Sequence, residues 1–346
     1  MFLNLVLLDA YGKNSLVVSS LLHQGSVLIR SQRFLYVCNH LLCYSHCRCD
    51  AIGYQVPSLP CMAMPTPSSN GQPRLIEEEV HVSCGKVHVV RTSLTSGQQP
   101  VFVLPGFLRG HGNMRALQNL LAEHGLNEMI LFDKSAAARS RLVQVPRNLH
   151  GQQSHIERGG TIVELCDALR VERADALTHS EGGLLALWAG LQRPGLFDTI
   201  VMANPPGLMK HENGFRVTFK YLLLSIKYGL HELLSPQTPL GKEMKLAGYG
   251  EKAWHLRQGV RNILAQVLSL SQAKIDSHLA RLTAHTNVGV LLTTGDLLYP
   301  PPQPAKAAKR AGVSVKIVPG QHDEITFSPE RIVGEMLTML KELRSS

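Results

Sequence analysis

A serine in a short polar segment is the first residue whose surroundings indicate chemistry. Residues 178–183 read Thr-His-Ser-Glu-Gly-Gly and lie between an apolar run at 174–177 and a helical pattern that begins at Glu181. A serine nucleophile needs this arrangement: a sharp turn from a strand into a helix, with small residues two positions before and after it. Small neighbours matter because the turn is strained and the helix passes close to adjacent strands. Ser180 is therefore a candidate nucleophile, although a serine that caps an ordinary helix would give a similar pattern.

A candidate base and a candidate acid each follow an apolar run of β-forming residues. Asp296 comes after the run at 288–292, and His322 comes after the run at 313–318. A serine hydroxyl is a poor nucleophile at neutral pH, so it needs an imidazole to take its proton, and the imidazole needs a carboxylate to hold its tautomer. Asp323 and Glu324 lie too close to His322 along the chain to swing round and orient it. The order Ser180, Asp296, His322 is the order expected of a triad on an α/β sheet.

Backbone N–H groups near the serine complete this hypothesis. The strand expected at 101–104 ends at Pro105-Gly106, and Phe107 follows. In enzymes that attack a carbonyl carbon, the oxyanion is bound by an N–H from this loop and by the N–H of the residue after the nucleophile. Phe107 and Glu181 are the candidates for this oxyanion hole, although an ordinary Pro-Gly turn explains the loop by itself.

The elements that must position these residues alternate between strand and helix. A hairpin is expected at 80–89, with its turn at Gly85-Lys86. Strands are then expected at 101–104, 129–132, 174–177, 199–203, 288–293 and 313–318, and helices around 114–121, 162–169, 181–191, 302–311 and 332–343. This alternation predicts an α/β fold with a mostly parallel sheet and helices on both faces. Residues 76–206 and 286–346 form the predicted core. Residues 207–285 form a predicted helical cap, with helices at 215–234 and 253–268.

From about Glu77 to Leu343 the chain resembles the capped serine hydrolases of the α/β-hydrolase fold. The resemblance rests on the segment 179–184 and on Pro319-Gly320 before His322. It implies an eight-stranded, mostly parallel sheet, with Ser180 as nucleophile, His322 as base and Asp296 as the orienting acid, and no metal or organic cofactor. Relatives with an aspartate nucleophile, such as epoxide hydrolases and haloalkane dehalogenases, are disfavoured because serine holds the position.

Four features depart from the commonest pattern of these enzymes. Thr178 replaces a glycine, Pro105 stands where histidine is common, and Gly295 directly precedes Asp296. The segment at 134–140 lacks the glycines often found there. These departures leave the triad intact but blur the subfamily.

The predicted reaction is cleavage of an acyl ester, as in a carboxylesterase or lipase, through an acyl-enzyme. The predicted partner is a small, hydrophobic acyl substrate, because the run at 215–226 is apolar nearly all round, although such runs more often simply pack on their neighbours. C–C bond hydrolysis, peptidase activity and acyl transfer stay open on the same triad, as does a non-catalytic ligand-binding receptor of this fold. The Glu181 side chain is either a substrate contact or a carboxylate favoured by the helix start.

Composition supports a globular protein without an obvious polymer or membrane partner. The chain has 346 residues, of which 44% are hydrophobic and 18% are charged. Its formal net charge of +9 comes from scattered Lys and Arg residues, so nucleic-acid binding is not expected. No apolar stretch is long enough for a membrane span, so no stable membrane insertion and a cytoplasmic location are expected.

The first 75 residues differ from the rest of the chain and are predicted to be a poorly ordered or dispensable extension. They hold five of the seven cysteines, and the spacing of Cys38, Cys43, Cys47 and Cys49 does not match a structural zinc site. The role of this Cys-rich stretch and the oligomeric state stay open. Residues 1–61 read either as a leader, with organellar targeting as one alternative, or as an over-long assignment of the start, with Met62 and Met64 as alternative starts.

Overall fold

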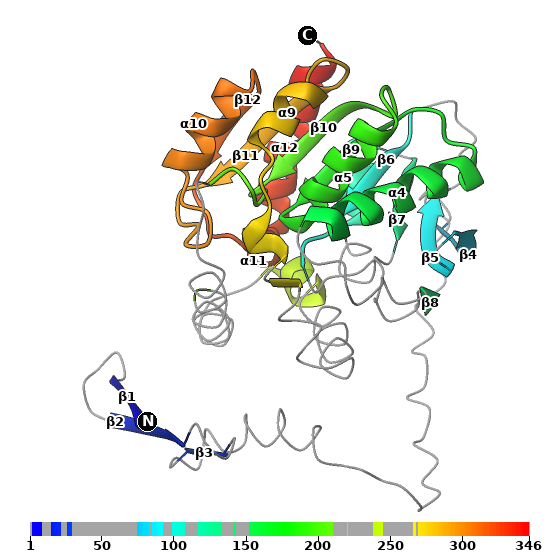
Figure 1. Cartoon of the computed structure of the whole chain (residues 1–346). Coiled ribbons are helices and arrows are strands. Elements are labelled where there is room, and N and C mark those ends of the chain that lie inside the picture. Colours follow the sequence, from blue (N-terminus) through cyan, green and yellow to red (C-terminus); the bar gives the residue numbers. More distant parts are fainter. Residues whose placement is uncertain are drawn as a thin grey trace, which may run out of the picture. The chain divides into compact units, whose positions relative to one another are not determined.

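The computed structural model divides the chain into two compact units, Met1–Met64 and Pro65–Ser346 (Figure 1). It describes residues 2–8, 15–21, 26–29, 75–83, 85–92, 99–107, 117–126, 128–132, 141–142, 152–209, 220, 238–244, 266–267 and 269–345. In the first unit these are three strands, β1 (Phe2–Leu8), β2 (Ser15–Leu21) and β3 (Ser26–Ile29), which pair antiparallel in that order. These strands differ from the poorly ordered extension predicted for this part of the chain. The Cys-rich stretch lies outside the described residues.

The second unit is built on a nine-stranded sheet. Eight strands form a continuous path in the order β12-β11-β10-β9-β6-β7-β5-β4, and the two-residue β8 pairs with β5 beside it. Along this path, the pairings that join β12, β11, β10, β9, β6 and β7 are all parallel. The pairings that β5 makes with β4, β7 and β8 are antiparallel. The predicted mostly parallel sheet is therefore confirmed. The strands are β4 (Leu75–Val82), β5 (Gly85–Thr92), β6 (Val101–Leu104), β7 (Met129–Phe132), β8 (Arg141–Leu142), β9 (Ala174–His179), β10 (Phe197–Ala203), β11 (Asn287–Thr293) and β12 (Ser314–Val318).

The expected hairpin is present, but its turn lies earlier than predicted. Gly85 is the first residue of β5 and pairs with Val82, so Gly85-Lys86 is not the turn. Gly85 has a φ of 135°, a conformation that side chains rarely adopt, so the glycine serves the exit from the turn. β4 also begins at Leu75, one residue before the predicted start of the core.

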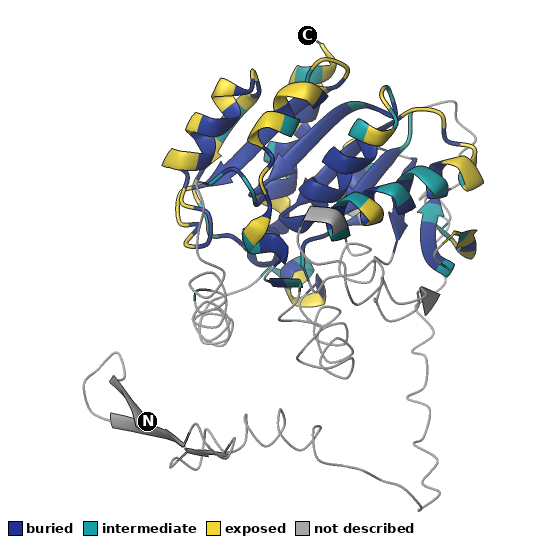
Figure 2. Ribbon diagram, in the orientation of Figure 1, coloured by how far each residue is buried: buried dark blue, intermediate teal, exposed yellow. Residues whose placement is uncertain are grey.

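Helices cover both faces of the sheet, as predicted. Residues alternate between the two faces along each strand: Phe102 and Leu104 of β6 belong to one buried cluster, and Val101 and Val103 belong to the other. The first cluster also takes residues from α4, α5, α9 and α10, and the second takes residues from α3, α11 and α12. Burial follows this layering, with the central strands buried and the outer helix surfaces exposed (Figure 2). The helices are α3 (Gln118–Glu123), α4 (Gln152–Leu169), α5 (Glu181–Gln192), α9 (Asp276–Leu282), α10 (Pro302–Arg310), α11 (Glu324–Phe327) and α12 (Pro329–Arg344).

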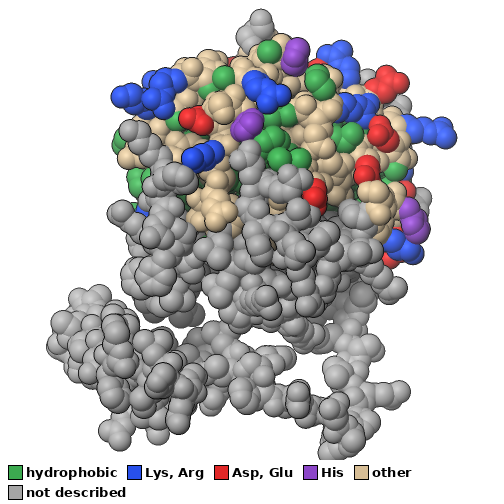
Figure 3. Space-filling view, viewed as in Figure 1, with side chains coloured by type: hydrophobic (Ala, Val, Ile, Leu, Met, Phe, Trp, Pro, Cys, Tyr) green, Lys and Arg blue, Asp and Glu red, His purple; other side chains and the backbone are tan. Residues whose placement is uncertain are grey.

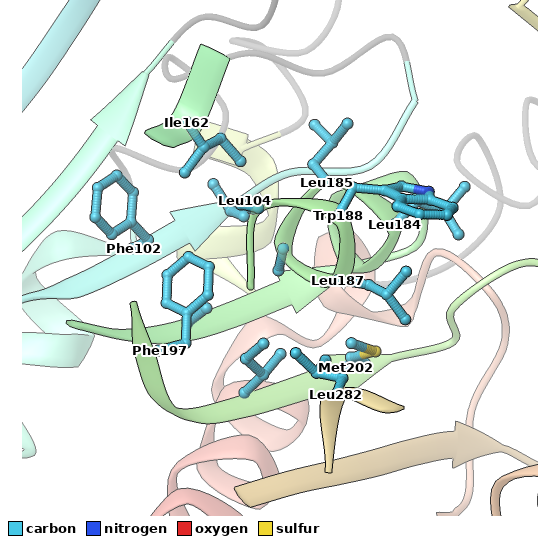
Figure 4. Close-up of a cluster of buried hydrophobic side chains, with 14 of the residues drawn as sticks. Phe102, Leu104, Ile162, Leu184, Leu185, Leu187, Trp188, Phe197, Met202 and Leu282 are labelled. Carbon is cyan, nitrogen blue, oxygen red and sulfur yellow. The ribbon is translucent and has the colours of Figure 1, made fainter. Parts of the chain in front are cut away.

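Aromatic and aliphatic side chains fill the layer between the sheet and α4 and α5. Phe102 lies edge-on to Phe132 and to Phe197, with ring centroids 6.5 and 6.1 Å apart. Leu184 and Leu187 of α5 pack in the same cluster (Figure 4). α5 is buried over its first ten residues, because it lies between the sheet and the neighbouring helices. This burial holds the start of α5 rigidly at the end of β9.

Much of the segment predicted as a cap lies outside the described residues. This includes the predicted helix at 215–234 apart from residue 220, most of the helix at 253–268, and the apolar run at 215–226. The last part of the segment is described as α9, whose Leu279 and Leu282 belong to the same core cluster as α5. α9 is thus part of the helical layer on the sheet, although its residues lie within the predicted cap.

Charged residues of both signs are scattered over the visible surface of the described part of the second unit (Figure 3). Lys and Arg side chains are interspersed with Asp and Glu on the face in Figure 3. Among the described residues, no helix combines the length and the apolar character that crossing a membrane requires.

Candidate active site

Ser180 lies at a sharp turn between β9 and α5. Its φ of 48° and ψ of −120° place a non-glycine residue in a conformation that is costly for an L-residue. The turn is held because the Ser180 N–H donates to the Ala203 carbonyl oxygen on β10, at 2.8 Å. An ordinary capping serine bonds the first helical turn, but the Ser180 side chain makes no such bond. The hydroxyl oxygen instead lies 3.0 Å from Nε2 of His322.

The neighbours of Ser180 explain why small residues surround it. A Cβ on Gly182 would overlap the backbone oxygen of Leu104, so only glycine lets α5 start against the end of β6. Thr178, which replaces the more common glycine, is 1% exposed, and its hydroxyl donates to the Val201 carbonyl oxygen. Its extra polar atom is therefore satisfied inside the sheet, and the departure from the usual pattern does not disturb the turn.

Asp296 follows β11 and His322 follows β12, so both come from the edge of the sheet at which β9 leads into Ser180. Nδ1 of His322 lies 2.7 Å from Oδ2 of Asp296, and both residues are buried. The other carboxylate oxygen of Asp296 accepts the N–H groups of Leu298 and Tyr299, at 2.8 and 2.9 Å. Backbone N–H groups can only donate, so this oxygen acts as an acceptor and the carboxylate is held in one orientation. The structure thus aligns a hydroxyl, an imidazole and a carboxylate in that order.

Close contact between two loops brings the acid to the histidine. The Gly295 N–H donates to the Gly320 carbonyl oxygen at 2.7 Å, and a Cβ on Gly295 would also lie 2.7 Å from that oxygen. Gly295 therefore permits the close approach that sets Asp296 beside His322. The adjacency of Gly295 and Asp296, a departure at the level of sequence, has this packing reason. Glu324, in contrast, accepts the Gln321 N–H and pairs with Arg331.

The loop after β6 lies beside the serine. A Cβ on Gly106 would lie 3.2 Å from the Ser180 Cβ and 2.8 Å from Nδ1 of His179. Phe107 is the next residue, so the loop predicted to supply an oxyanion N–H lies close to Ser180. The role of the Phe107 and Glu181 N–H groups remains a prediction.

The side chain of Glu181 forms an ion pair inside the protein. Its Oε1 lies 2.6 Å from Nη1 of Arg158 on α4, and the two side chains are 1% and 8% exposed. This pair joins α4 to the first residue of α5. Of the two interpretations of this carboxylate, the structure supports a structural partner at the helix start.

Three buried residues beside the triad were not assigned a role from the sequence. His179 precedes the serine, and its Nε2 lies 2.9 Å from the His322 carbonyl oxygen. Asn204 follows β10 and Thr293 ends β11, and both bond the same histidine loop. A polar residue directly after an apolar strand was the available signal for Asn204, because the carboxyl ends of parallel strands share one edge of the sheet.

A metal at this position would compete with the hydrogen bonds just described. Among the described residues, His179, His322 and Asp323 offer potential ligand atoms within 4.8 Å of one another. Both ring nitrogens of His322 lie at hydrogen-bonding distance from Asp296 and Ser180. In this structure both ring nitrogens of His322 are thus engaged by Asp296 and Ser180, and a metal ion would have to displace one of these partners.

The chain has the α/β-hydrolase fold, as its likeness to solved structures shows. The crystal structure of the enol-lactonase from Burkholderia xenovorans LB400 is similar, with a TM-score of 0.57 at 12% identity, over 78% of this chain and all of that one (100%). No family model matches the chain.

Two curated proteins are similar over parts of the sequence. One is 3-oxoadipate enol-lactonase 1 of Acinetobacter baylyi, 33% identical over 81 residues, which are 22% of this chain and 30% of that protein. The other is the putative carbamate hydrolase RutD of Caulobacter sp., 31% identical over 122 residues, which are 35% of this chain and 42% of that protein. The matches span less than half the length of these relatives.

Proposed function

We propose that the protein is a serine hydrolase that cleaves acyl esters through Ser180, His322 and Asp296. The observation that carries the proposal is the hydrogen-bonded series from the strained Ser180 through His322 to Asp296, with spacings of 3.0 and 2.7 Å. An activated serine needs its hydroxyl, its base and the orienting acid in this order. Similarity to an enol-lactonase and to a putative carbamate hydrolase is in keeping with attack on a carbonyl carbon.

The mechanism follows from the hydrogen bonds. Ser180 Oγ attacks the acyl carbonyl carbon while Nε2 of His322 takes its proton. Asp296 stabilises the imidazolium, because its carboxylate oxygen faces Nδ1. The oxyanion is bound by the N–H groups of Phe107 and Glu181, an interaction worth about 10²–10³ in rate per donor. His322 returns the proton to the leaving alcohol, and water then releases the acyl group by the same steps.

The substrate is proposed to be a small molecule with a hydrophobic acyl group. This part rests on the apolar run at 215–226 and on the family resemblance. A panel of p-nitrophenyl esters of increasing chain length, a lactone, a carbamate and a peptide anilide separates this substrate class from the alternatives. A cytoplasmic location, with organellar targeting by residues 1–61 as the alternative, remains a prediction from the sequence.

The test is covalent labelling of the intact protein with a fluorophosphonate. We expect one adduct per chain, located on Ser180 by peptide mapping and absent from Ser180→Ala. Ser269→Ala is a matched control, because Ser269 is also buried and its hydroxyl lies 3.0 Å from Nε2 of His155. This control should label as fast as the unmodified protein.

The outcome also separates the enzyme from a binding protein of the same fold. Labelling of Ser180 followed by turnover of any ester in the panel supports a hydrolase. A folded protein that takes up no label would refute the proposal and favour a receptor, and an adduct on Ser269 would refute the assignment of the nucleophile.

A further inference from the structure

A second strained residue lies directly beside the candidate nucleophile. Among the described non-glycine residues, positive φ angles occur at Arg170 (56°), Ser180 (48°) and Asn204 (48°). His179 of β9 pairs with Ala203 of β10, so Ser180 and Asn204 follow neighbouring strands at the same level. Glycine would adopt this backbone conformation without strain. The presence of asparagine in place of glycine therefore points to a use for the Asn204 side chain, as is proposed for the side chain of Ser180.

The hydrogen bonds of Asn204 set the orientation of its amide without ambiguity. Its Oδ1 accepts the Thr293 backbone N–H at 2.9 Å, a group that can only donate. The Nδ2 group faces the His322 carbonyl oxygen at 3.2 Å, which can only accept. Asn204 is 2% exposed, so neither bond is replaced easily by water. The amide thus joins the end of β11 to the backbone of the candidate base.

Two further side chains hold the same stretch of backbone. The Thr293 hydroxyl accepts from Nδ2 of Asn204 at 3.0 Å and can then donate to the Gln321 carbonyl oxygen, also at 3.0 Å. His179 Nε2 faces the His322 carbonyl oxygen at 2.9 Å and must carry a hydrogen there, since that oxygen can only accept. The carbonyl groups of Gln321 and His322 are therefore held by side chains from the ends of β9, β10 and β11.

We propose that Asn204 is a positioning residue for His322. Its amide, with Thr293 and His179, holds the backbone of the histidine loop so that the imidazole faces Asp296 on one side and Ser180 on the other. Misplacement of a reacting group by about 1 Å can cost about 10²-fold in rate. This inference rests on the proposed function, because it assigns Asn204 to the base of that reaction.

The test uses Asn204→Gly, which keeps the backbone conformation and removes only the side chain. We expect kcat on the best ester of the panel and the second-order rate of fluorophosphonate labelling to fall by about 10²-fold, with KM changed by less than about twofold. The proton NMR signal of the hydrogen on His322 Nδ1, which faces Asp296, should shift or broaden. Arg170→Gly is the matched control, since it replaces another residue of positive φ, at the end of α4, and should leave kcat, KM, the labelling rate and the NMR signal unchanged.

Asn204→Asp covers the case in which the glycine variant does not fold. The aspartate keeps the size and the acceptor for the Thr293 N–H, but in its ionised form it has no hydrogen to donate to the His322 oxygen. We expect the same loss of kcat and labelling rate. If either folded variant matches the wild-type rates and NMR signal, the positioning role is overturned. If the wild-type protein labels nowhere, the proposed function itself has failed.

Discussion

Replacing Asp296 by asparagine is the sharpest test of the proposed triad, because the structure dictates how the new amide must lie. One carboxylate oxygen of Asp296 accepts the N–H groups of Leu298 and Tyr299, at 2.8 and 2.9 Å. These groups can only donate, so the asparagine oxygen must take that place and its NH₂ must face Nδ1 of His322. Nδ1 then becomes an acceptor, and the imidazole proton moves to Nε2.

The consequence is a base of nearly unchanged geometry in the wrong tautomer. An Nε2–H that faces Ser180 Oγ, 3.0 Å away, cannot take the hydroxyl proton. The same change of tautomer in a Ser-His-Asp protease lowers kcat by about 10⁴-fold, which corresponds to about 5.4 kcal/mol of transition-state stabilisation. We expect a loss of this order in kcat/KM and a similar loss in the rate of fluorophosphonate labelling.

The assay is ester hydrolysis at pH 7–8 with purified variants whose folding is checked by thermal unfolding. Asp323→Asn is the matched control, since Asp323 adjoins His322 along the chain but Asp296 faces Nδ1. We expect Asp323→Asn to keep most of the activity. A fall of less than about tenfold for Asp296→Asn, or a larger loss for Asp323→Asn, would refute the assignment of the acid.

Three further predictions concern stability and reactivity. Gly182→Ala should lower the free energy of unfolding by about 1–3 kcal/mol in urea titrations, because the new Cβ would overlap the end of β6. Gly334→Ala is the control: Gly334 lies in open space on α12, so the alanine should raise the free energy of unfolding by about 0.5–1 kcal/mol. Arg158→Met removes the guanidinium that pairs with the buried Glu181 carboxylate, and it should cost about 3–5 kcal/mol. Adding Glu181→Leu should recover most of this loss. An Arg158→Met variant as stable as the wild-type protein would contradict the prediction. Burial raises the pKa of Cys166 to about 12, so at pH 8 only about 10⁻⁴ of the thiol is ionised, and peptide mapping after maleimide treatment should find it unmodified until the protein unfolds.

Local pattern was enough to predict the elements around the site. Short apolar runs predicted β6, β7, β9, β10 and β11 to within two residues at either end, because buried parallel strands carry apolar side chains on both faces. The hairpin turn was misplaced because a glycine with a φ of 135° serves the exit of a turn as well as its centre. The strands of the first unit were missed, since no clear alternation marks them.

The sequence by itself determined which chemistry-bearing residues follow strands, and in what order along the chain. Ser180, Asp296 and His322 could be selected in this way, because the carboxyl ends of parallel strands lie at one edge of a sheet.

Only the tertiary structure decided which partners those residues meet. The distances of 3.0 and 2.7 Å, the contact of Gly295 with Gly320 and the amide orientation of Asn204 depend on residues more than twenty positions apart. Hydrogen bonds require alignment within fractions of an ångström, and that alignment is set by strand register and loop packing, which no local pattern encodes.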